Sequence, residues 1–224
     1  EKITNTDAIP TYSATYGDKL STLTVPSSST GDWKWKDITD ATAVGNAGSA
    51  QHTLVFTPDD TVNYASREVT VTVAVAKAVI TTPAPLNPTN VYANVTYTSG
   101  LTDTDLYTVV DNGGMAVGAY TATLTLTNSA NYAWDNVSNE SATTSVSYEI
   151  TAGTNAITGA AINGWTYGET GNAGSATAKY GDIVITYKAE GEDDSKYTAA
   201  LPKNAGNYIA RFTTTDTNCP IISE

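Results

Sequence analysis

Apolar and polar residues alternate with a period of two along several stretches of the chain. Residues 120–127 alternate apolar side chains with threonine, residues 69–75 alternate valine with threonine or alanine, and residues 146–150 repeat the pattern. Successive side chains of a β-strand point to opposite faces, so this period predicts antiparallel sheets with one face toward water. No window of helical length shows a period of 3.6 residues. The pattern therefore predicts an all-β chain.

Three stretches with this alternation resemble one another and predict an internal repeat. They comprise residues 47–57, 117–127 and 205–215, and each opens with a small or apolar residue followed by a glycine. Those glycines, Gly48, Gly118 and Gly206, lie 70 and 88 residues apart. Self-similarity at such a spacing is typical of tandem modules, here of about 70 to 90 residues each.

The boundaries of the modules are predicted where alternation stops and prolines begin. Residues 76–88 include three prolines, which cannot donate regularly to a sheet. We expect modules at 1–77, 78–151 and 152–224, with a short or missing closing strand in the third. Each module is predicted to be a small Ig-like β-sandwich, with a β-grasp-like sheet as the alternative, and the arrangement to be elongated.

Composition and charge narrow the classes of partner. The chain is 40% hydrophobic and 15% charged, with a formal charge of −12. No cluster of Lys and Arg is available to bind phosphates, so neither nucleic acid nor an anionic membrane is expected as a partner. Like-charge repulsion favours a monomer. The single cysteine, Cys219, excludes an intrachain disulfide.

Short motifs recur in the same order in the predicted modules. The first contains Tyr16-Gly17-Asp18, Trp33-Lys34-Trp35, Phe56-Thr57-Pro58-Asp59-Asp60 and Asn63-Tyr64; the second contains Gly118-Ala119-Tyr120 and Asn131-Tyr132-Ala133-Trp134; the third contains Trp165-Thr166-Tyr167-Gly168-Glu169, Tyr180-Gly181-Asp182 and Ala205-Gly206-Asn207-Tyr208. Together they resemble the Ig-like repeats of bacterial surface proteins of the MBG or YDG type, which occur as tandem arrays in adhesin-like proteins.

The resemblance implies an extracellular protein, secreted or held at the bacterial cell wall, that acts in adhesion or as a spacer. Its partner would be a host or microbial surface protein or a glycan. The resemblance supplies no catalytic residues, and we expect no enzymatic activity. The single histidine, His52, cannot form a histidine-based triad or a metal site with two or three histidines.

Acidic clusters and aromatic residues are the remaining candidates for binding chemistry. No cofactor is expected, and Ca²⁺ is the one ion considered, at Asp59-Asp60, at Asp103 with Asp105, or at Glu190 with Glu192-Asp193-Asp194. Solvated turns are the other interpretation of these clusters.

Trp33 and Trp35 share one face of a predicted strand, where they could stack on a sugar ring. Because phenylalanine is scarce, at least three of the four tryptophans are expected to fill cores instead. The function predicted first is a non-catalytic adhesion or spacer array. The alternative is a carbohydrate-binding accessory region of a larger secreted enzyme.

Overall fold

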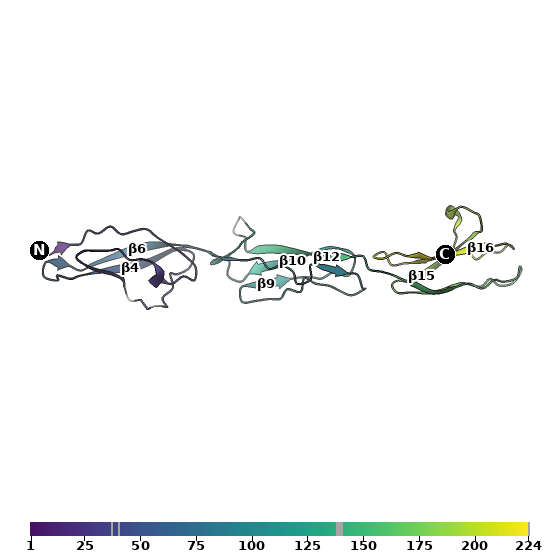
Figure 1. Cartoon of the computed structure of the whole chain (residues 1–224), viewed down its shortest axis with the longest axis horizontal. Helices are drawn as coiled ribbons and strands as arrows, with labels where there is room; N and C mark the ends of the chain where they lie inside the picture. The colour runs from purple at the N-terminus through teal and green to yellow at the C-terminus, as the bar shows by residue number, and fades with distance from the viewer. Residues whose placement is uncertain (37, 40, 138–140, 224) are drawn as a thin grey trace. The chain divides into compact units, whose positions relative to one another are not determined.

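The computed structural model describes residues 1–36, 38–39, 41–137 and 141–223 (Figure 1). Its regular elements are short strands and two single-turn 3₁₀ helices, and no α-helix occurs in this part of the chain. The predicted all-β fold is confirmed. No helix formed by the described residues is long and apolar enough to cross a bilayer.

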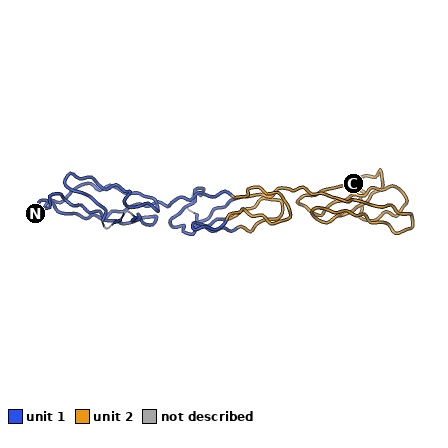
Figure 2. Tube along the Cα trace, turned by 60° about the horizontal axis from the view of Figure 1, so that its bottom comes forward, with its two compact units in different colours: residues 1–84, 102–110, 123–146 blue, residues 85–101, 111–122, 147–224 orange. Residues whose placement is uncertain are grey.

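The Cα trace divides into two compact units (Figure 2). Unit 1 comprises residues 1–84, 102–110 and 123–146, and unit 2 comprises residues 85–101, 111–122 and 147–224. The division into modules at 1–77, 78–151 and 152–224, and their elongated arrangement, stay predictions.

Unit 1 contains a four-stranded sheet with the order β2-β6-β4-β3. Its strands are β2 (Tyr12–Thr15), β3 (Gly31–Trp35), β4 (Gly48–Pro58) and β6 (Arg67–Ala76). The central strand β6 runs antiparallel to β4, in a register that extends from Phe56 opposite Arg67 to Gly48 opposite Val75. Its other edge pairs in parallel with β2. The strand β6 therefore has ladder hydrogen bonds on both sides.

One face of this sheet forms the core, as the alternation predicts. Val71, Val73 and Val75 of β6 are buried, and the residues between them are exposed. The core is completed by Leu54 and Phe56 of β4, which have no exposed surface. Two residues outside the sheet, Leu20 of the helix η1 (Leu20–Thr22) and Val44, pack against the same cluster.

Unit 1 also contains shorter pairs. They are β1 (Ile3–Thr4) with β5 (Tyr64–Ala65), β7 (Ala78–Ile80) with β11 (Tyr132–Trp134), and β9 (Tyr107–Val110) with residues 123–126 of β10 (Gly118–Leu126). The first two pairs are parallel and the third is antiparallel. Each parallel pair includes the tyrosine of an Asn-Tyr motif, at Tyr64 or Tyr132, so the two motifs take equivalent positions.

Unit 2 begins with the parallel pairing of β8 (Thr89–Val91) and the end of β12 (Thr143–Thr151). An antiparallel pair follows, β13 (Ile157–Ala161) with β14 (Ser175–Ala178). A three-stranded sheet then has the order β15-β16-β17, formed by β15 (Ile183–Ala189), β16 (Tyr208–Thr214) and β17 (Ile222–Ser223). The short 3₁₀ helix η2 (Asp194–Lys196) lies between β15 and β16 in the sequence.

The predicted inward faces of β10 and β12 are confirmed as well. Ala122 and Leu124 have no exposed surface, and Leu126 is nearly as buried. On β12, Tyr148 and Ile150 are buried at alternate positions. The two strands are neighbours in a sheet with the order β8-β12-β10-β9, which repeats the order β2-β6-β4-β3.

We predict that Leu54→Ala destabilises the first sheet by about 2–5 kcal/mol, because the cavity it leaves lies where the side chain has no exposed surface. Urea unfolding followed by tryptophan fluorescence measures the loss. Val62→Ala is the control, since Val62 is 77% exposed, and it should change stability by no more than about 0.5 kcal/mol. Equal effects of the two changes would contradict this assignment of the core.

Candidate functional site

The structure places Trp33 and Trp35 in the core of the first sheet. Both side chains are buried, at 3% and 7% exposure. The Trp33 indole N–H donates to the Asp7 carboxylate at 3.0 Å, and the Trp35 indole N–H donates to the Leu23 carbonyl at 3.2 Å. With their polar edges bonded and their rings covered, these two residues present no surface platform to a sugar ring.

The other two tryptophans differ from each other in exposure. Trp134 is buried and donates its indole N–H to the Ala142 carbonyl at 3.1 Å. Trp165 is half-buried. The expectation that at least three of the four tryptophans fill cores is therefore confirmed, and Trp165 is the one that remains accessible to a ligand.

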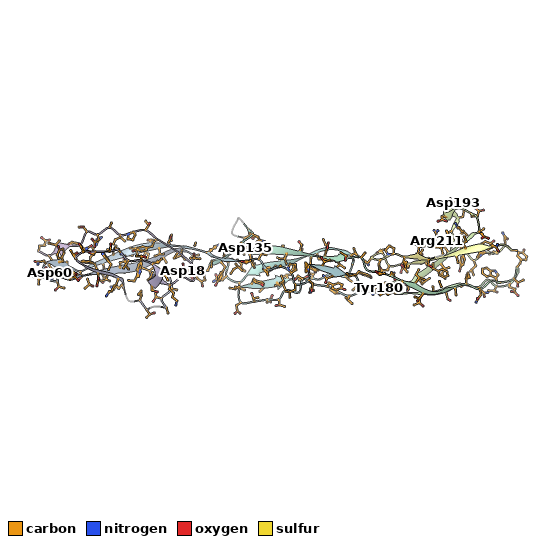
Figure 3. All side chains as sticks on the ribbon, viewed as in Figure 1. Asp18, Asp60, Asp135, Tyr180, Asp193 and Arg211 are labelled. Atoms are coloured by element: carbon orange, nitrogen blue, oxygen red, sulfur yellow. The ribbon has the colours of Figure 1, made fainter. Side chains whose placement is uncertain are left out.

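Within each acidic cluster, at least one carboxylate binds groups of the chain itself, namely Asp60, Asp103, Asp193 and Asp194. Asp60, labelled in Figure 3, accepts the backbone N–H groups of Val62 and Asn63 at 2.9 and 3.1 Å. Bonds from the side chain and backbone of Asn63 lower the pKa of the Asp60 carboxyl. Asp103 similarly accepts the N–H of Val109 at 2.7 Å. The bonds of Asp60 are those of a capped turn, whereas the bond of Asp103 reaches a residue of β9.

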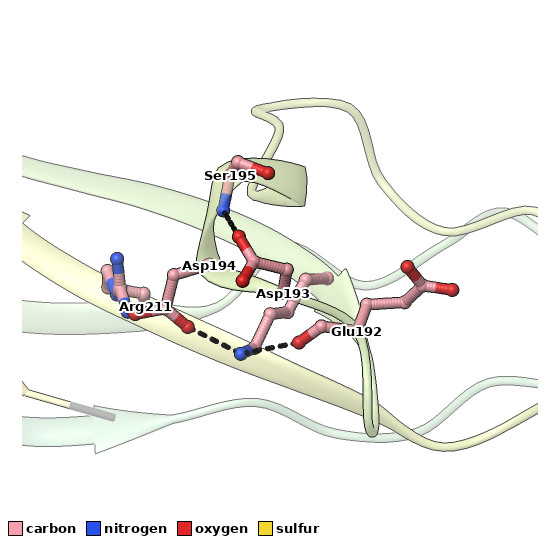
Figure 4. A network of polar contacts seen from close by, with 6 residues as sticks. Glu192, Asp193, Asp194, Ser195 and Arg211 are labelled. Carbon is pink, nitrogen blue, oxygen red and sulfur yellow. Dashed lines mark hydrogen bonds and ion pairs between the residues drawn. The ribbon is translucent and has the colours of Figure 1, made fainter.

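The cluster at 192–194 is a network of ion pairs and a cap (Figure 4). The Asp194 carboxylate forms ion pairs with Lys188, at 2.6 Å, and with Arg211. Hydrogen bonds from these two side chains, the one from Lys188 having the larger effect, lower the pKa of the Asp194 carboxyl. Asp193 accepts the N–H of Ser195 at 2.9 Å. Among the described residues, no group of three or more His, Cys, Asp and Glu side chains is placed to hold a metal ion.

His52 and Cys219 both have structural partners. His52 is half-buried, and its Nε2 lies 2.9 Å from the Val44 carbonyl. Cys219 is buried, and burial raises the pKa of its thiol, as does the charge of Asp216. A raised thiol pKa disfavours the thiolate, which is the nucleophilic form.

A different set of contacts joins residues that were assigned to different predicted modules. Within unit 1, the side-chain oxygen of Asn131 accepts the backbone N–H of Ala47 at 2.8 Å. The rings of Tyr16 and Tyr132 meet edge to face, with centroids 5.3 Å apart. We call the Asn131–Ala47 hydrogen bond the first junction contact. It connects segments that are 84 residues apart in the sequence.

Unit 2 contains a second contact of the same kind. The side-chain oxygen of Asn218 accepts the backbone N–H of Val117 at 2.7 Å, across 101 residues of sequence. Here the rings of Tyr92 and Tyr180 meet edge to face, with centroids 5.3 Å apart. We call the Asn218–Val117 hydrogen bond the second junction contact.

The two junction contacts use equivalent positions of the repeat. Ala47 and Val117 each precede a glycine with positive φ, at +115° for Gly48 and +156° for Gly118. A residue with a Cβ is strained in that conformation, whereas glycine adopts it readily. Glycine at this position therefore permits the backbone bend that places the N–H of the preceding residue. The equivalence extends to the aromatic partners, because Tyr16 and Tyr92 donate their backbone N–H groups to the last residues of β6 and β12.

A hydrogen bond joins Tyr92 to Asp216, two residues before Asn218 of the second junction contact. The Tyr92 hydroxyl donates to Asp216 at 2.6 Å. This bond is the largest cause of the lowered pKa of the Asp216 carboxyl. It is also the largest cause of the raised pKa of the Tyr92 hydroxyl. Tyr92 also packs with the buried residues Ile150 and Cys219.

A cavity of about 540 Å³ lies beside β16 in unit 2. It is lined by residues 162–165, Tyr167, Tyr187, Glu190 and residues 202–210. Its aromatic lining includes Trp165, Tyr167 and Tyr208, of which Tyr167 is 74% exposed.

The sequence motifs identified Asn131 but not Asn218. Asn131 belongs to the Asn-Tyr motif of the second predicted module, whereas Asn218 is followed by Cys219. The signal that could have found Asn218 is its place shortly after the third glycine-headed stretch. No protein-family model matches the chain, and a search of curated proteins finds no relative.

We predict that Tyr92→Phe raises the pKa of Asp216 toward its ordinary value, because the strongest donor to that carboxylate is lost. The pKa of Asp216 is lower in the folded chain than its ordinary value of 3.8. The ionised carboxylate therefore stabilises the folded chain fully above pH 3.8, and this stabilisation is lost as the pH falls through the pKa of the folded state. An NMR pH titration of the Asp216 carboxyl carbon measures the change. Tyr97→Phe, which removes a bond to the Val91 carbonyl, is the control. An unchanged Asp216 titration in Tyr92→Phe would show that the bond does not form.

Proposed function

We propose that the chain is a non-catalytic array of small β repeats that acts in adhesion or as a spacer at the surface of a bacterium. The observation that carries this proposal is the recurrence of one junction contact at two places. In both, an asparagine side chain accepts the N–H that precedes a glycine-headed strand. A contact used twice at equivalent positions supports a tandem array, because each repeat then offers the same surface to the next.

Short connections support a stiff array. The strand β6 ends at Ala76 and β7 begins at Ala78, so one residue separates them. The strand β7 then pairs with β11, which begins immediately after Asn131. A single hydrogen bond contributes only about 1 kcal/mol. With so short a connection, however, little chain entropy opposes the contact.

The chemistry of the surface fits a protein or glycan partner outside the cell. The net charge of −12 favours solubility and disfavours binding to phosphates. The outward faces of β6 and β12 carry mainly threonine, serine and glutamate. Such faces can bind a partner through hydroxyl groups and exposed backbone without strong charge.

One feature favours the alternative, a carbohydrate-binding accessory region of a larger secreted enzyme. Trp165 and Tyr167 line the cavity beside β16, and aromatic rings of this kind can stack on sugars. The burial of the other three tryptophans weighs against this alternative, since a row of exposed rings is what an extended glycan would need.

A binding and turnover assay tests the proposed function directly. The chain is displayed on beads and presented to glycan arrays and to surface proteins of host and microbial cells. The same chain is incubated in solution with a panel of polysaccharides and peptides. We expect the beads to be retained by a glycan or a surface protein, and we expect no polysaccharide or peptide to be turned over. Turnover that persists through purification would contradict the proposal.

We predict that Asn131→Ala loosens the first junction contact without unfolding either flanking sheet, because it removes an acceptor worth about 1 kcal/mol. Backbone ¹⁵N relaxation measures the result. In the unchanged chain, residues 48–76 and 78–80 should share one tumbling time, and in Asn131→Ala their tumbling times should separate. Asn112→Ala, at an exposed position, is the matched control. Equal tumbling behaviour in all three proteins would show that the Asn131 bond does not stiffen the junction, and separate tumbling times in the unchanged chain would count against a stiff junction.

A further inference from the structure

The turn that carries Asn218 is closed by the carboxylate of Asp216. The Oδ1 atom of Asp216 accepts the backbone N–H of Asn218 at 2.8 Å and that of Cys219 at 3.2 Å. Its Oδ2 atom accepts the Tyr92 hydroxyl at 2.6 Å. The Asn218 side chain, which this turn orients, accepts the N–H of Val117 at 2.7 Å. The second junction contact therefore depends on the acceptors of Asp216.

The corresponding turn at the first junction contact is closed by groups without charge. Asn128 and Asp216 each lie ten residues after the glycine that heads the preceding strand. The backbone carbonyl of Asn128 accepts the N–H of Asn131 at 3.2 Å and that of Tyr132 at 3.0 Å. Its side-chain oxygen accepts the side-chain N–H of Asn131 at 3.3 Å. A peptide carbonyl and a carboxamide take up no proton in mild acid, so this turn has no counterpart of the Asp216 charge.

Protonation would weaken the bonds that Asp216 accepts. A hydrogen bond to an ionised acceptor is about twice as strong as one between neutral groups. A proton on Oδ2 would also meet the hydroxyl hydrogen of Tyr92, which could then no longer be donated to that atom. The bonds that favour the charged form of Asp216 are thus the bonds that hold the turn, and both are lost when the proton binds.

The neighbourhood of Asp216 contains one other carboxylate. The titratable and charged groups that face Asp216 are the Tyr92 hydroxyl, the Cys219 thiol and, from the segment 179–182, those of Lys179, Tyr180 and Asp182. This segment packs against Asp216, because a Cβ added at Gly181 would lie 3.0 Å from the Asp216 Cβ. An ammonium group already carries its proton, and a phenol or a thiol is neutral in acid. Asp182 therefore supplies the other carboxylate of this set.

We propose that the second junction contact is an acid-sensitive joint, in which protonation of Asp216 releases Asn218 from Val117. The first junction contact keeps its bond between Asn131 and Ala47 under the same conditions. Acid thus opens one of the two contacts and leaves the other closed. The joint follows from contacts within unit 2, and it holds whether or not the chain serves in a bacterial surface array.

Amide hydrogen exchange of the 224-residue chain, followed by NMR as the pH is lowered, tests this proposal. The intrinsic rate at each pH divided by the observed rate gives the protection of each amide. The protection of Val117 should be constant above pH 3.8 and fall at least about tenfold as the pH passes through the lower pKa of folded Asp216. The protection of Ala47 should change by less than about threefold.

Three results of this experiment would overturn the proposal. The first is constant protection of Val117 over the whole titration. The second is an equal loss of protection at Ala47. The third is a loss at Val117 that occurs only together with the amides of the sheet β8-β12-β10-β9, since these amides report the unfolding of that sheet as a whole.

Two matched variants distinguish the Asp216 charge from a general effect of acid. Asp216→Asn keeps an oxygen acceptor but takes up no proton, so the protection of Val117 should no longer fall in acid. Asp182→Asn removes the neighbouring carboxylate and should leave the fall unchanged. A fall that persists in Asp216→Asn would overturn the proposal, as would a fall that disappears in Asp182→Asn.

Tyr92→Phe keeps the proposal testable if Asp216→Asn does not fold. Without the hydroxyl donor, the pKa of Asp216 rises toward its ordinary value, so Val117 should lose its protection at a higher pH than in the unchanged chain. Tyr97→Phe, which removes a bond to the Val91 carbonyl, should leave the midpoint of this loss where it is. The same midpoint in Tyr92→Phe and in the unchanged chain would contradict the proposed role of Asp216.

Discussion

The structure depends on the pairing of two strands at the centre of a sheet. One is a glycine-headed strand, β4 or β10, and the other, which we call the closing strand, is β6 or β12. In the first sheet, β4 and β6 pair over nine residues, from Phe56 opposite Arg67 to Gly48 opposite Val75. This register sets the inward face of both strands, because a slip of one residue would expose the whole apolar set. It also places the turn before Gly48, and with it the N–H of Ala47 that Asn131 bonds. Core and junction thus follow from one ladder of hydrogen bonds.

The same constraint gives a common physical account of the two junction contacts. The tyrosine that follows β2 or β8 donates its backbone N–H to the last residue of the closing strand, β6 or β12. Its ring packs against the ring of another tyrosine. In unit 2, Tyr167 is exposed and lines the cavity of about 540 Å³ beside β16. The two junction contacts are therefore two consequences of one arrangement of strands.

Much of the fold could be predicted from the sequence, since alternation is a local property. The inward faces at 69–75, 120–126 and 146–150 needed only the period of two. The burial of Trp33 and Trp35 depends in contrast on Leu20 and Val44, which lie in segments without periodicity. The junction contacts were not predicted, because they join residues 84 and 101 positions apart through single asparagine side chains.

The central claim is that the peptide N–H before each glycine-headed strand is a docking point for an asparagine. Ala47, Val117 and Ala205 occupy this position in the three stretches, and an asparagine side chain bonds the first two. Amide hydrogen exchange of these three residues in the unmodified chain tests the claim in one experiment. The account predicts slow exchange at Ala47 and Val117 and fast exchange at Ala205. Equally fast exchange at all three positions would contradict it.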